Sequence, residues 1–250
     1  MNSPHLVVAL RYELRGVWAT SARMYLPFAR RKYGVRGLTR VVSPDTDLVI
    51  EGYRRSGNTF AVMAFESAQE EGLKLAHHLH APAQIKAAVR WGVPSLLLIR
   101  PPEQTVISEV IYEPGITLRQ ALRSYIRFHR SLLPYRNGIV IATFHDVTSN
   151  FGDVIERLNT HYGTSFAPFE HTEKNVSRCF EAIEASYRTR FGRVLEERIA
   201  RPSVARDRSR LELMAAYRQA SLRGLRARAE HLYSSLARDS GGRAPILSES

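Results

Sequence analysis

A run of small, hydroxyl-bearing and basic residues follows a short apolar segment in the first quarter of the chain. The run covers residues 53–60 and reads Tyr-Arg-Arg-Ser-Gly-Asn-Thr-Phe. Ser56 and Gly57 permit a tight turn, after which backbone N–H groups would point into one concavity and a helix N-terminus would favour an anion. This chemistry suits a phosphate group. The alternative is an ordinary strand-to-helix turn in which Asn58 or Thr59 is the N-cap.

The same loop lacks groups that a metal-dependent nucleotide site requires. An ATP- or GTP-binding loop needs Gly-Lys-Ser/Thr, in which the Lys reaches the β- and γ-phosphates and the hydroxyl holds Mg²⁺. Asn58 stands where that Lys would be, and the apolar segment 95–99 ends in Arg100 rather than in a metal-binding Asp. A kinase or nucleotide hydrolase is therefore disfavoured. We expect a ligand with one 5′-phosphate and a group to transfer, bound without metal.

Residues 53–60 resemble, without a gap, the loop Tyr-Pro-Lys-Ser-Gly-Thr-Thr-Trp of the sulfotransferases that use PAPS, 3′-phosphoadenosine 5′-phosphosulfate. Arg55 falls on the family Lys that bridges donor and acceptor oxygens, and Phe60 falls on the family aromatic residue. The resemblance implies a catalytic role for Arg55, although Arg cannot readily donate a proton as Lys can. It also implies that PAPS is bound by Arg54, Arg55, Ser56, Gly57, Asn58 and Thr59. Arg54 departs from the family pattern, which has proline there.

A second part of the resemblance concerns the 3′-phosphate that distinguishes PAPS from ordinary nucleotides. The family holds this phosphate with an Arg at the end of a strand and a Ser eight positions later on the following helix. Arg100 follows the apolar segment 95–99, and Ser108 lies eight positions further on. The resemblance therefore implies that Arg100 and Ser108 bind the donor.

Three histidines lie in the segment 76–82, which reads Ala-His-His-Leu-His-Ala-Pro. The segment resembles the family's His-Leu-Pro-like stretch, and His78 has the family spacing of 22 residues before Arg100. The resemblance implies that His78 is the general base, since a His that titrates near neutrality can take the proton of an acceptor hydroxyl. Two alternatives stay open: His77 or His80 is the base, or the three histidines bind a metal. No Cys lies nearby and the spacing is irregular, so we predict no metal.

The elements that must position these residues alternate between strands and helices. Apolar, β-branched runs predict strands at 47–51, 73–76, 95–99 and 138–144. Helical patterns cover 5–33, 58–71, 83–91, 117–135, 173–199 and 206–238, and a further helix capped by Asp146 or Thr148 runs to Tyr162. Such alternation predicts an α/β fold of three layers, with a central, mostly parallel sheet, helices on both faces, and helical N- and C-terminal extensions. Ligands in such sheets bind beyond the carboxyl ends of the strands.

The length of 250 residues is typical of one sizeable core. We predict a single sulfotransferase-like domain over 1–240, with its core at about 45–165 and a helical C-terminal part at 170–238, followed by a disordered tail at 241–250. The resemblance covers Asp47–Gly163 and includes Phe144-His145-Asp146-Val147, which resembles the family's Tyr-Glu-Asp-Leu. The family's C-terminal Arg-Lys-Gly segment, which closes over the nucleotide, has no match. Arg188, Arg190 and Arg193 are the candidates to replace it.

The charge of +12 comes almost entirely from arginine, which is 32 of the 36 basic residues. Either phosphate binding or a coding bias explains this excess. Between Arg11 and Arg40 there is one acid, Glu13, so this segment is a candidate for peripheral contact with an anionic membrane. The alternative is a helix that packs a face with Trp18 and Tyr25 onto the domain. The single cysteine, Cys179, excludes an intrachain disulfide, and no apolar run approaches the ~20 residues of a membrane span. We expect a cytoplasmic protein.

These observations together predict a metal-independent sulfotransferase that moves a sulfonate group from PAPS to a hydroxyl or amine. The acceptor is expected to be a small molecule, a lipid or a carbohydrate, and no oligomeric state is predicted. One alternative is a degenerate protein that binds PAP or another nucleotide without catalysis. Another is a basic module that binds a membrane or nucleic-acid surface. The absence of an aromatic–basic RNA motif and of a recognition-helix pattern leads us to expect no nucleic-acid partner.

Overall fold

Parallel strands form the centre of the computed structural model, which describes residues 3–34, 40–194, 196, 199, 201 and 205–239. The strands are β1 (Leu48–Gly52), β2 (Leu75–His77), β3 (Ser95–Ile99) and β4 (Val140–Thr143). They lie in the order β2-β1-β3-β4, and every neighbouring pair is parallel. Ile50 of β1 pairs with His77 on one side and with Leu96 on the other. Both faces of β1 and β3 are buried, which explains why these strands are mostly apolar, with Glu51 as the acid of β1.

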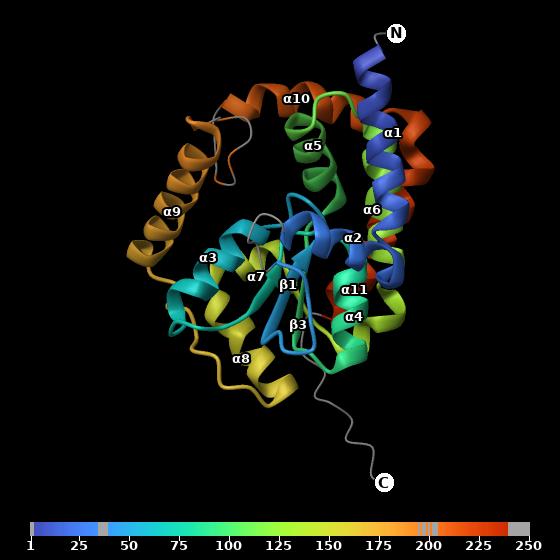
Figure 1. Cartoon of the computed structure of the whole chain (residues 1–250). Helices are drawn as coiled ribbons and strands as arrows, with labels where there is room; N and C mark the ends of the chain where they lie inside the picture. Colours follow the sequence, from blue (N-terminus) through green and yellow to red (C-terminus); the bar gives the residue numbers. More distant parts are fainter. Residues whose placement is uncertain are drawn as a thin grey trace.

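Helices cover both faces of this sheet. Their bounds are α1 (Ser3–Trp18), α2 (Ala22–Gly34), α3 (Asn58–Ala68), α4 (Pro82–Trp91), α5 (Pro102–Tyr112), α6 (Leu118–Arg130), α7 (Phe144–Ser149), α8 (Phe151–Tyr162), α9 (Glu173–Phe191), α10 (Ala205–Tyr217) and α11 (Arg223–Asp239). Leu97 and Ile99 point into a core that they share with α4, α6 and α11, whereas Leu96 and Leu98 face a second core with α3, α8 and α9. Figure 1 shows α3 and α8 on one side of the sheet and α4 and α11 on the other. The predicted three-layer α/β fold is confirmed.

The N-terminal helical region predicted at 5–33 is two helices. The chain turns between α1 and α2, where the carbonyl of Ala19 accepts a hydrogen bond from the Ala83 N–H at the start of α4. In a continuous helix, the Ala19 carbonyl would instead accept a hydrogen bond from an N–H group of the next helical turn. It also anchors the turn beside the loop that follows β2.

Two other predicted helices end earlier than the sequence pattern suggested, and a third is interrupted. The helix predicted at 173–199 ends at Phe191, because Gly192 takes a left-handed conformation (φ 71°) and its N–H bonds to the Arg188 carbonyl. The helix predicted at 206–238 is interrupted after Tyr217 and resumes at Arg223. The helix predicted at 117–135 ends at Arg130 and is followed by a 3₁₀ turn, Leu133–Gly138, that has Pro134 near its start.

The helix expected to end at Tyr162 is also divided, and neither predicted cap is its N-cap. Thr143 caps α7, and Asp146 completes a capping box by accepting a hydrogen bond from the Thr143 N–H. The Thr148 hydroxyl donates instead to the Phe144 carbonyl within the helix. Asn150, with φ −155° and ψ 81°, separates α7 from α8.

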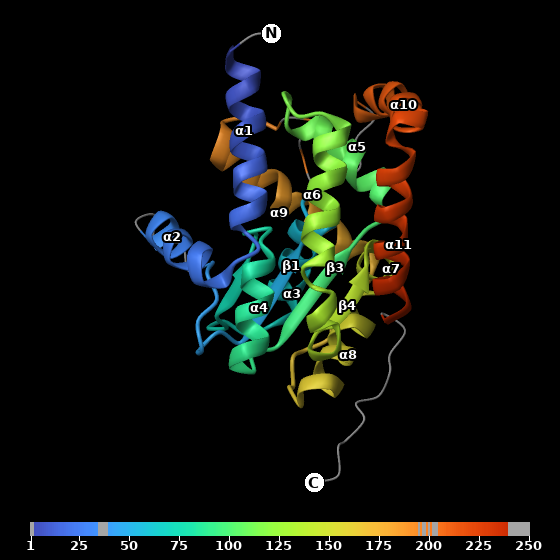
Figure 2. The ribbon, with the colours of Figure 1, turned by 90° about the vertical axis from the view of Figure 1, so that its right-hand side faces the viewer.

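The C-terminal helices pack around the core rather than apart from it. Helix α9 packs against α3, α10 against α5, and α11 against α6. Figure 2 shows α11 running alongside the sheet beside α6, with α10 above it. The predicted tail at 241–250 lies outside the described residues. None of the described helices is both long enough and apolar enough to cross a lipid bilayer.

Candidate functional site

The candidate site lies beside β1, where the direction in which successive strands are added to the sheet changes. From β1 the chain proceeds to β2 on one side, and later returns to form β3 on the other. The loops that follow β1 and β3 therefore diverge at the carboxyl end of the sheet, which is where open α/β sheets bind ligands. Residues 53–57 follow β1, and Arg100 follows β3.

The loop after β1 has an unusual backbone. Arg55 and Gly57 have positive φ angles, 65° and 93°, and Gly57 is the N-cap of α3 without any side-chain cap. The alternative prediction that Asn58 or Thr59 is the N-cap is therefore wrong. The Asn58 amide donates to the Tyr53 carbonyl at 3.1 Å and closes the loop. A Cβ atom on Gly57 would lie 3.2 Å from the Phe144 ring, so glycine suits both the conformation and the space.

Two polar side-chain atoms of this loop are buried without a hydrogen-bond partner among the described residues. They are the Ser56 hydroxyl and the Asn58 carbonyl oxygen. The Ser56 side chain has no solvent-accessible surface. Leaving such a group without a partner costs on the order of 1–3 kcal/mol. These atoms adjoin the uncapped N-terminus of α3, so the loop combines backbone donors with a buried hydroxyl.

Arg55 contacts two of the other predicted donor-binding residues, Arg100 and Ser108. Arg55 Nε donates to Ser108 Oγ at 3.0 Å, and Arg100 Nη1 donates to the Arg55 carbonyl at 3.0 Å. The guanidinium of Arg55 lies over the Tyr112 ring at 5.0 Å, and that of Arg100 lies over the Phe144 ring at 4.1 Å. These cation–π contacts orient both planar groups at the carboxyl end of the sheet.

The structure places the Arg54 side chain elsewhere. Its guanidinium forms an ion pair of 2.8 Å with Glu109, which is fully buried, and lies over the Tyr12 ring. Glu109 neighbours Ser108 on α5, but adjacent helical residues point in different directions. Burial raises the pKa of Glu109 and the charge of Arg54 opposes this rise. Arg54 thus contributes its backbone to the loop, while its side chain neutralises a buried carboxylate.

The histidine loop after β2 approaches the phosphate loop. His78 Nε2 is 3.2 Å from the Thr59 hydroxyl, and His78 Nδ1 is within hydrogen-bonding distance of His77 Nδ1. His78 and His80 both have positive φ angles, 58° and 48°. This conformation is uncommon for residues other than glycine, and it directs the two side chains differently from an extended strand.

Burial lowers the basicity of two of the three histidines. It lowers the pKa of His77 to about 4 and that of His80 to about 3. His80 Nδ1 also lies 3.0 Å from the Gly52 carbonyl, which can only accept a hydrogen bond. Both side chains are therefore neutral at pH 7 and weak as proton acceptors. Within the described part of the chain, no three His, Cys, Asp or Glu side chains are arranged to hold a metal ion.

Glu51, a buried acid on β1, holds the histidine loop and was missed by the sequence reasoning. Its carboxylate accepts hydrogen bonds from Leu79 N–H (2.6 Å), His80 N–H (2.9 Å) and the Gln84 amide (2.9 Å). Burial raises its pKa to about 8, and these donors oppose the rise. The signal available in the sequence was the single acid at the end of an otherwise apolar strand.

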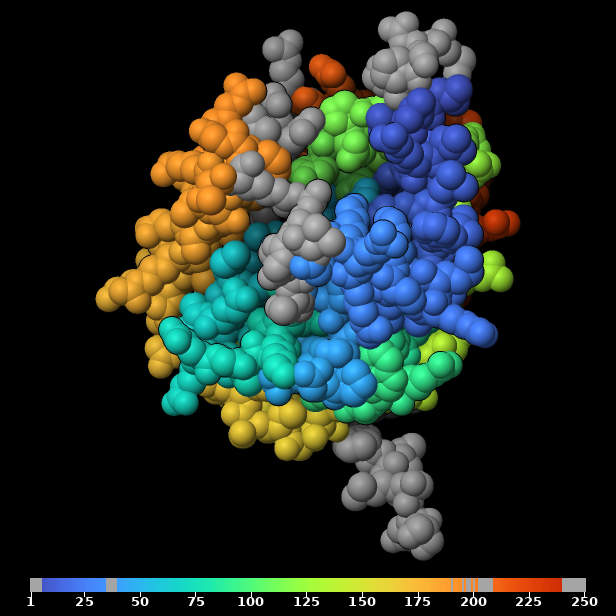
Figure 3. Space-filling model, in the orientation of Figure 1, coloured from blue at the N-terminus to red at the C-terminus, as the bar shows by residue number. Residues whose placement is uncertain are grey.

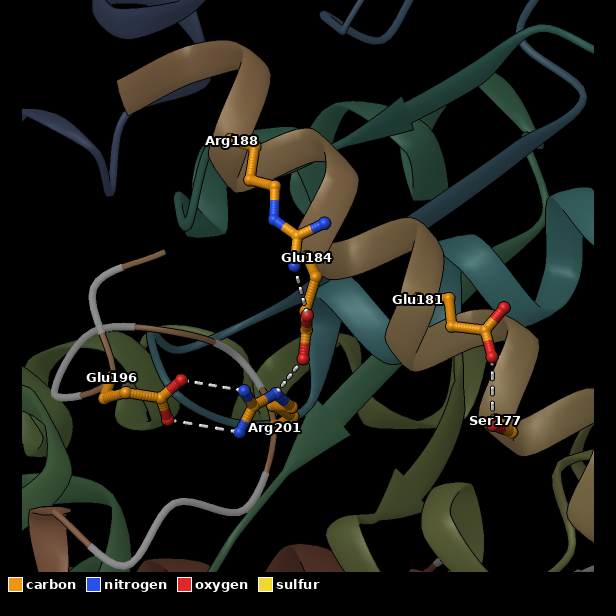
Figure 4. A network of polar contacts seen from close by, with 6 residues as sticks. All are labelled: Ser177, Glu181, Glu184, Arg188, Glu196 and Arg201. Atoms are coloured by element: carbon orange, nitrogen blue, oxygen red, sulfur yellow. Dashed lines mark hydrogen bonds and ion pairs between the residues drawn. The ribbon is translucent and has the colours of Figure 1, made fainter. Parts of the chain in front are cut away.

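A C-terminal segment reaches Arg55. The Ile199 carbonyl accepts a hydrogen bond from Arg55 Nη2 at 3.3 Å. Arg201 holds this segment against α9, since its guanidinium bonds to both Glu184 (2.6 Å) and Glu196 (2.8 Å), as Figure 4 shows. Sequence reasoning did not select Arg201, because fifteen interspersed arginines between 178 and 243 give no local signal.

Of the residues proposed to replace the missing C-terminal motif, Arg188 pairs with Glu184 on the exposed side of α9. Arg193 is exposed beyond the end of α9, and the Arg190 side chain lies outside the described part of the structure. The contact with Arg55 comes instead from the segment of Ile199 and Arg201.

Comparison with known proteins gives distant likenesses among solved structures. No protein-family model matches the chain, and no curated protein sequence matches it. The chain is similar to the crystal structure of mouse sulfotransferase SULT7A1 complexed with PAP, at 12% sequence identity and a TM-score of 0.40. The match covers 78% of this chain and 92% of that chain. At this identity and TM-score, the likeness assigns neither a family nor an activity.

Proposed function

We propose that the chain binds PAPS and transfers its sulfonate group to a hydroxyl or amine acceptor without a metal ion. The observation that carries this proposal is the meeting of Arg55, Arg100 and Ser108 beside the uncapped N-terminus of α3. Two arginines and a hydroxyl at a helix N-terminus form a setting for a ligand that carries more than one anionic group.

The donor would use the two parts of this setting separately. Its 5′-phosphosulfate would accept hydrogen bonds from the first N–H groups of α3 and from the buried Ser56 hydroxyl, which has no partner among the described residues. Its 3′-phosphate would bind Arg100 and Ser108, because a planar guanidinium can donate two parallel hydrogen bonds to a phosphate. Thr59, at the second position of α3, would contact the transferring group from the side of His78.

In the chemical step, the acceptor oxygen forms a bond to sulfur while the bond between sulfur and the bridging phosphate oxygen breaks. The products are the sulfated acceptor and PAP. His78 takes the acceptor proton, and Arg55 neutralises the charge that develops on the bridging oxygen. If His78 donates from Nδ1 to His77, its Nε2 is the unprotonated atom, and this atom adjoins Thr59. The lowered pKa values of His77 and His80 favour His78 as the base.

One observation favours a second candidate, the binding of PAP without turnover. Arg55 occupies the place of the family lysine, and its guanidinium is bonded to Ser108 and to the Ile199 carbonyl. To reach a bridging oxygen, Arg55 would have to exchange these bonds for bonds to the donor. If that exchange is unfavourable, the site binds nucleotide but does not stabilise the transferring group.

Isothermal titration of PAP and AMP in the presence of EDTA tests the donor site. We expect PAP to bind at micromolar concentration and AMP much more weakly. Arg100→Ala should weaken PAP binding by about 2–3 kcal/mol and Ser108→Ala by about 1 kcal/mol, through loss of charge-assisted and neutral hydrogen bonds. Arg157→Ala is the control. Arg157 lies on α8 and donates to the Ile141 carbonyl of β4, so its loss removes an arginine that is not among the predicted donor-binding residues. Equal affinity for AMP and PAP would contradict a 3′-phosphate site.

A transfer assay separates the two candidates. Labelled PAPS is incubated with pooled phenolic, carbohydrate and lipid acceptors, and labelled products are counted. Transfer that Arg100→Ala abolishes supports the sulfotransferase. Selective PAP binding without transfer to any pool supports the binding protein instead.

A further inference from the structure

The outward face of α1 is apolar. Its exposed apolar side chains recur at helical spacing, and each is between 44% and 62% accessible: Leu6, Val7, Leu10, Leu14, Val17 and Trp18. On an ordinary surface helix, the solvent-facing stripe is polar and the apolar stripe faces the core. Helix α1 has the reverse arrangement along most of its length.

Polar contacts fix this orientation from the inner side. The Tyr12 hydroxyl bonds to the Tyr53 hydroxyl at 2.7 Å, Glu13 pairs with Arg127 at 3.0 Å, and Arg15 donates to the Leu79 carbonyl at 2.7 Å. Rotation of α1 to bury its apolar stripe would break all three contacts. The exposed apolar face is therefore a property of how the helix is bound to the domain.

Helix α2 extends the same surface. Met24 and Phe28 are about half exposed, and the ring of Phe28 lies 5.7 Å from that of Trp18, which joins the two helices. Figure 3 shows α1 and α2 as one continuous surface on the side of the molecule opposite α9. We call these eight apolar residues of α1 and α2 the N-terminal face.

The exposed charged side chains among the described residues of α1 and α2 are cationic. The exposed basic residues on the two helices are Arg11, Arg23, Arg30, Arg31 and Lys32. Glu13 is the only acid in residues 3–34, and it is paired with Arg127. The surface thus combines an apolar centre with a cationic margin.

We infer that the N-terminal face docks on an anionic lipid bilayer. Its apolar side chains would enter the boundary between headgroups and acyl chains, while the arginines bind lipid phosphates and carboxylates. A second copy of this chain suits the face poorly, because two copies would bring their cations together without acids to pair them. Nucleic acid suits its apolar centre poorly. This inference does not depend on the donor proposal.

Sedimentation with vesicles tests the inference in the full chain. We expect the protein to pellet with vesicles of phosphatidylserine and phosphatidylcholine at a ratio of about 3:7, and much less with phosphatidylcholine alone or at high salt. In a Trp91→Phe background, Trp18 is the remaining tryptophan. Its fluorescence should shift to the blue on addition of anionic vesicles as the ring leaves water.

Matched variants distinguish binding through the N-terminal face from nonspecific hydrophobic or electrostatic binding elsewhere on the protein. Leu10→Ser/Leu14→Ser/Trp18→Ser should weaken binding by at least about tenfold, because the inserted apolar area is lost. Leu211→Ser, which removes an exposed leucine of α10, should have no effect. Arg23→Glu/Arg31→Glu should also weaken binding, whereas Arg223→Glu/Arg228→Glu on α11 should do so much less. Circular dichroism and thermal melting check that each variant is folded.

Three outcomes would overturn the inference. The wild-type chain fails to pellet with anionic vesicles, or the triple serine variant binds them as well as wild type does. Alternatively, analytical ultracentrifugation shows a wild-type dimer that the triple variant converts to a monomer, while neither protein binds vesicles. In this last case the N-terminal face is a contact between copies of the chain. All of these measurements are independent of PAP binding.

Discussion

Arg55 joins the parts of the candidate site. Its backbone has a left-handed φ of 65°, its carbonyl accepts a hydrogen bond from Arg100, and its guanidinium bonds to Ser108. A left-handed conformation costs a residue other than glycine on the order of 1–2 kcal/mol, so it persists where surrounding contacts impose it. Here the contacts come from β3 and α5, which are distant in sequence. The loop conformation therefore depends on the same residues that would bind the donor.

The role proposed for His78 predicts a loss of turnover without a loss of donor affinity. His78→Ala should lower kcat by about 10²–10⁴-fold, the usual effect of losing a general base, and leave PAP affinity within a few-fold. Steady-state kinetics and isothermal titration measure the two quantities. Arg55→Ala should reduce both, whereas Arg55→Lys should keep substantial activity because it restores a flexible cation.

His77→Ala and His80→Ala are the comparisons for this prediction. Both side chains are neutral and weakly basic because burial lowers their pKa values, so neither replacement should mimic His78→Ala in kcat. If one of them abolishes turnover while His78→Ala does not, that residue is the base. Activity in all three variants would contradict a histidine base.

The family resemblance associated Arg100 with Ser108, but it did not orient every loop residue. In the structure each of these two residues contacts Arg55. It directs the Arg54 side chain to Glu109 instead, because a fully buried carboxylate on α5 requires a cation. Such a partner is separated by 55 positions in the chain. Nothing within the loop sequence could reveal it.

At the scale of elements, β1 supports the site through Glu51 as well as through the phosphate loop. The carboxylate of Glu51 binds the N–H groups of Leu79 and His80 in the loop after β2. This bridge between adjacent strand ends fixes a loop that contains two left-handed histidines. Glu51 acts on this loop through backbone N–H groups, so we describe it as a positioning residue.

Replacing Glu51 should therefore impair both stability and turnover. Glu51→Gln offers one oxygen acceptor in place of two, so at least one of the loop N–H groups is left without its partner. We expect a loss of about 1–3 kcal/mol in the free energy of unfolding, measured in urea. We also expect a lower kcat with PAP affinity within a few-fold. Glu66→Gln, on the exposed side of α3, is the control.

Glu51→Asp tests whether the loss comes from position rather than charge. Its carboxylate is one methylene shorter, so it should restore stability only in part, and kcat should follow the recovery of the loop. A Glu51→Gln protein that is destabilised but has wild-type kcat would show that Glu51 serves the fold alone.

The same elements show which boundaries a sequence can predict. The strand predicted at 95–99 is β3, because both of its faces are buried and the apolar run ends where the strand ends. The strand predicted at 73–76 is shifted to Leu75–His77, since Leu73 is exposed and the Lys74 N–H bonds to the Asp47 carboxylate. The long helix predicted at 173–199 did not account for Gly192 as its C-terminal cap. Ends that depend on partners elsewhere were the ones predicted poorly.

At the scale of the whole molecule, the N-terminal face and the histidine loop are neighbours. Arg15 of α1 bonds to the Leu79 carbonyl, and the turn after α1 is anchored to Ala83. Helix α1 would thus separate a bilayer bound at its outward face from the loop that carries His78. The sequence left open whether Trp18 and Tyr25 pack on the domain. Tyr25 does and Trp18 is half exposed, because the inward contacts of α1 are mainly polar.

Three histidines whose surroundings exclude water should make the stability of the protein depend on pH. Burial lowers the pKa of His77 to about 4, of His80 to about 3 and of His129 to about 4, from an ordinary value of 6.5. Below pH 6.5 the unfolded chain binds protons at these sites and the folded chain does not, so stability falls as pH falls toward those values. Glu51 acts in the opposite direction. Its folded pKa of about 8 exceeds the ordinary 4.5, so its contribution decreases as pH rises between these values.

His129 allows the loss of stability at acidic pH to be measured separately, because it is not one of the predicted site residues. Its side chain is fully buried, its Nδ1 bonds to the Tyr125 carbonyl at 2.9 Å, and its ring packs on that of Tyr125. Phe fits this aromatic cluster and cannot be protonated. Between about pH 7.5 and about pH 5, His129→Phe should lose roughly 2 kcal/mol less of its free energy of unfolding than wild type loses. Urea titrations at the two pH values measure this difference, and His231→Asn, at an exposed position of α11, should keep the wild-type slope. Parallel losses in wild type and His129→Phe would mean that folded and unfolded chains protonate His129 equally, contrary to its burial.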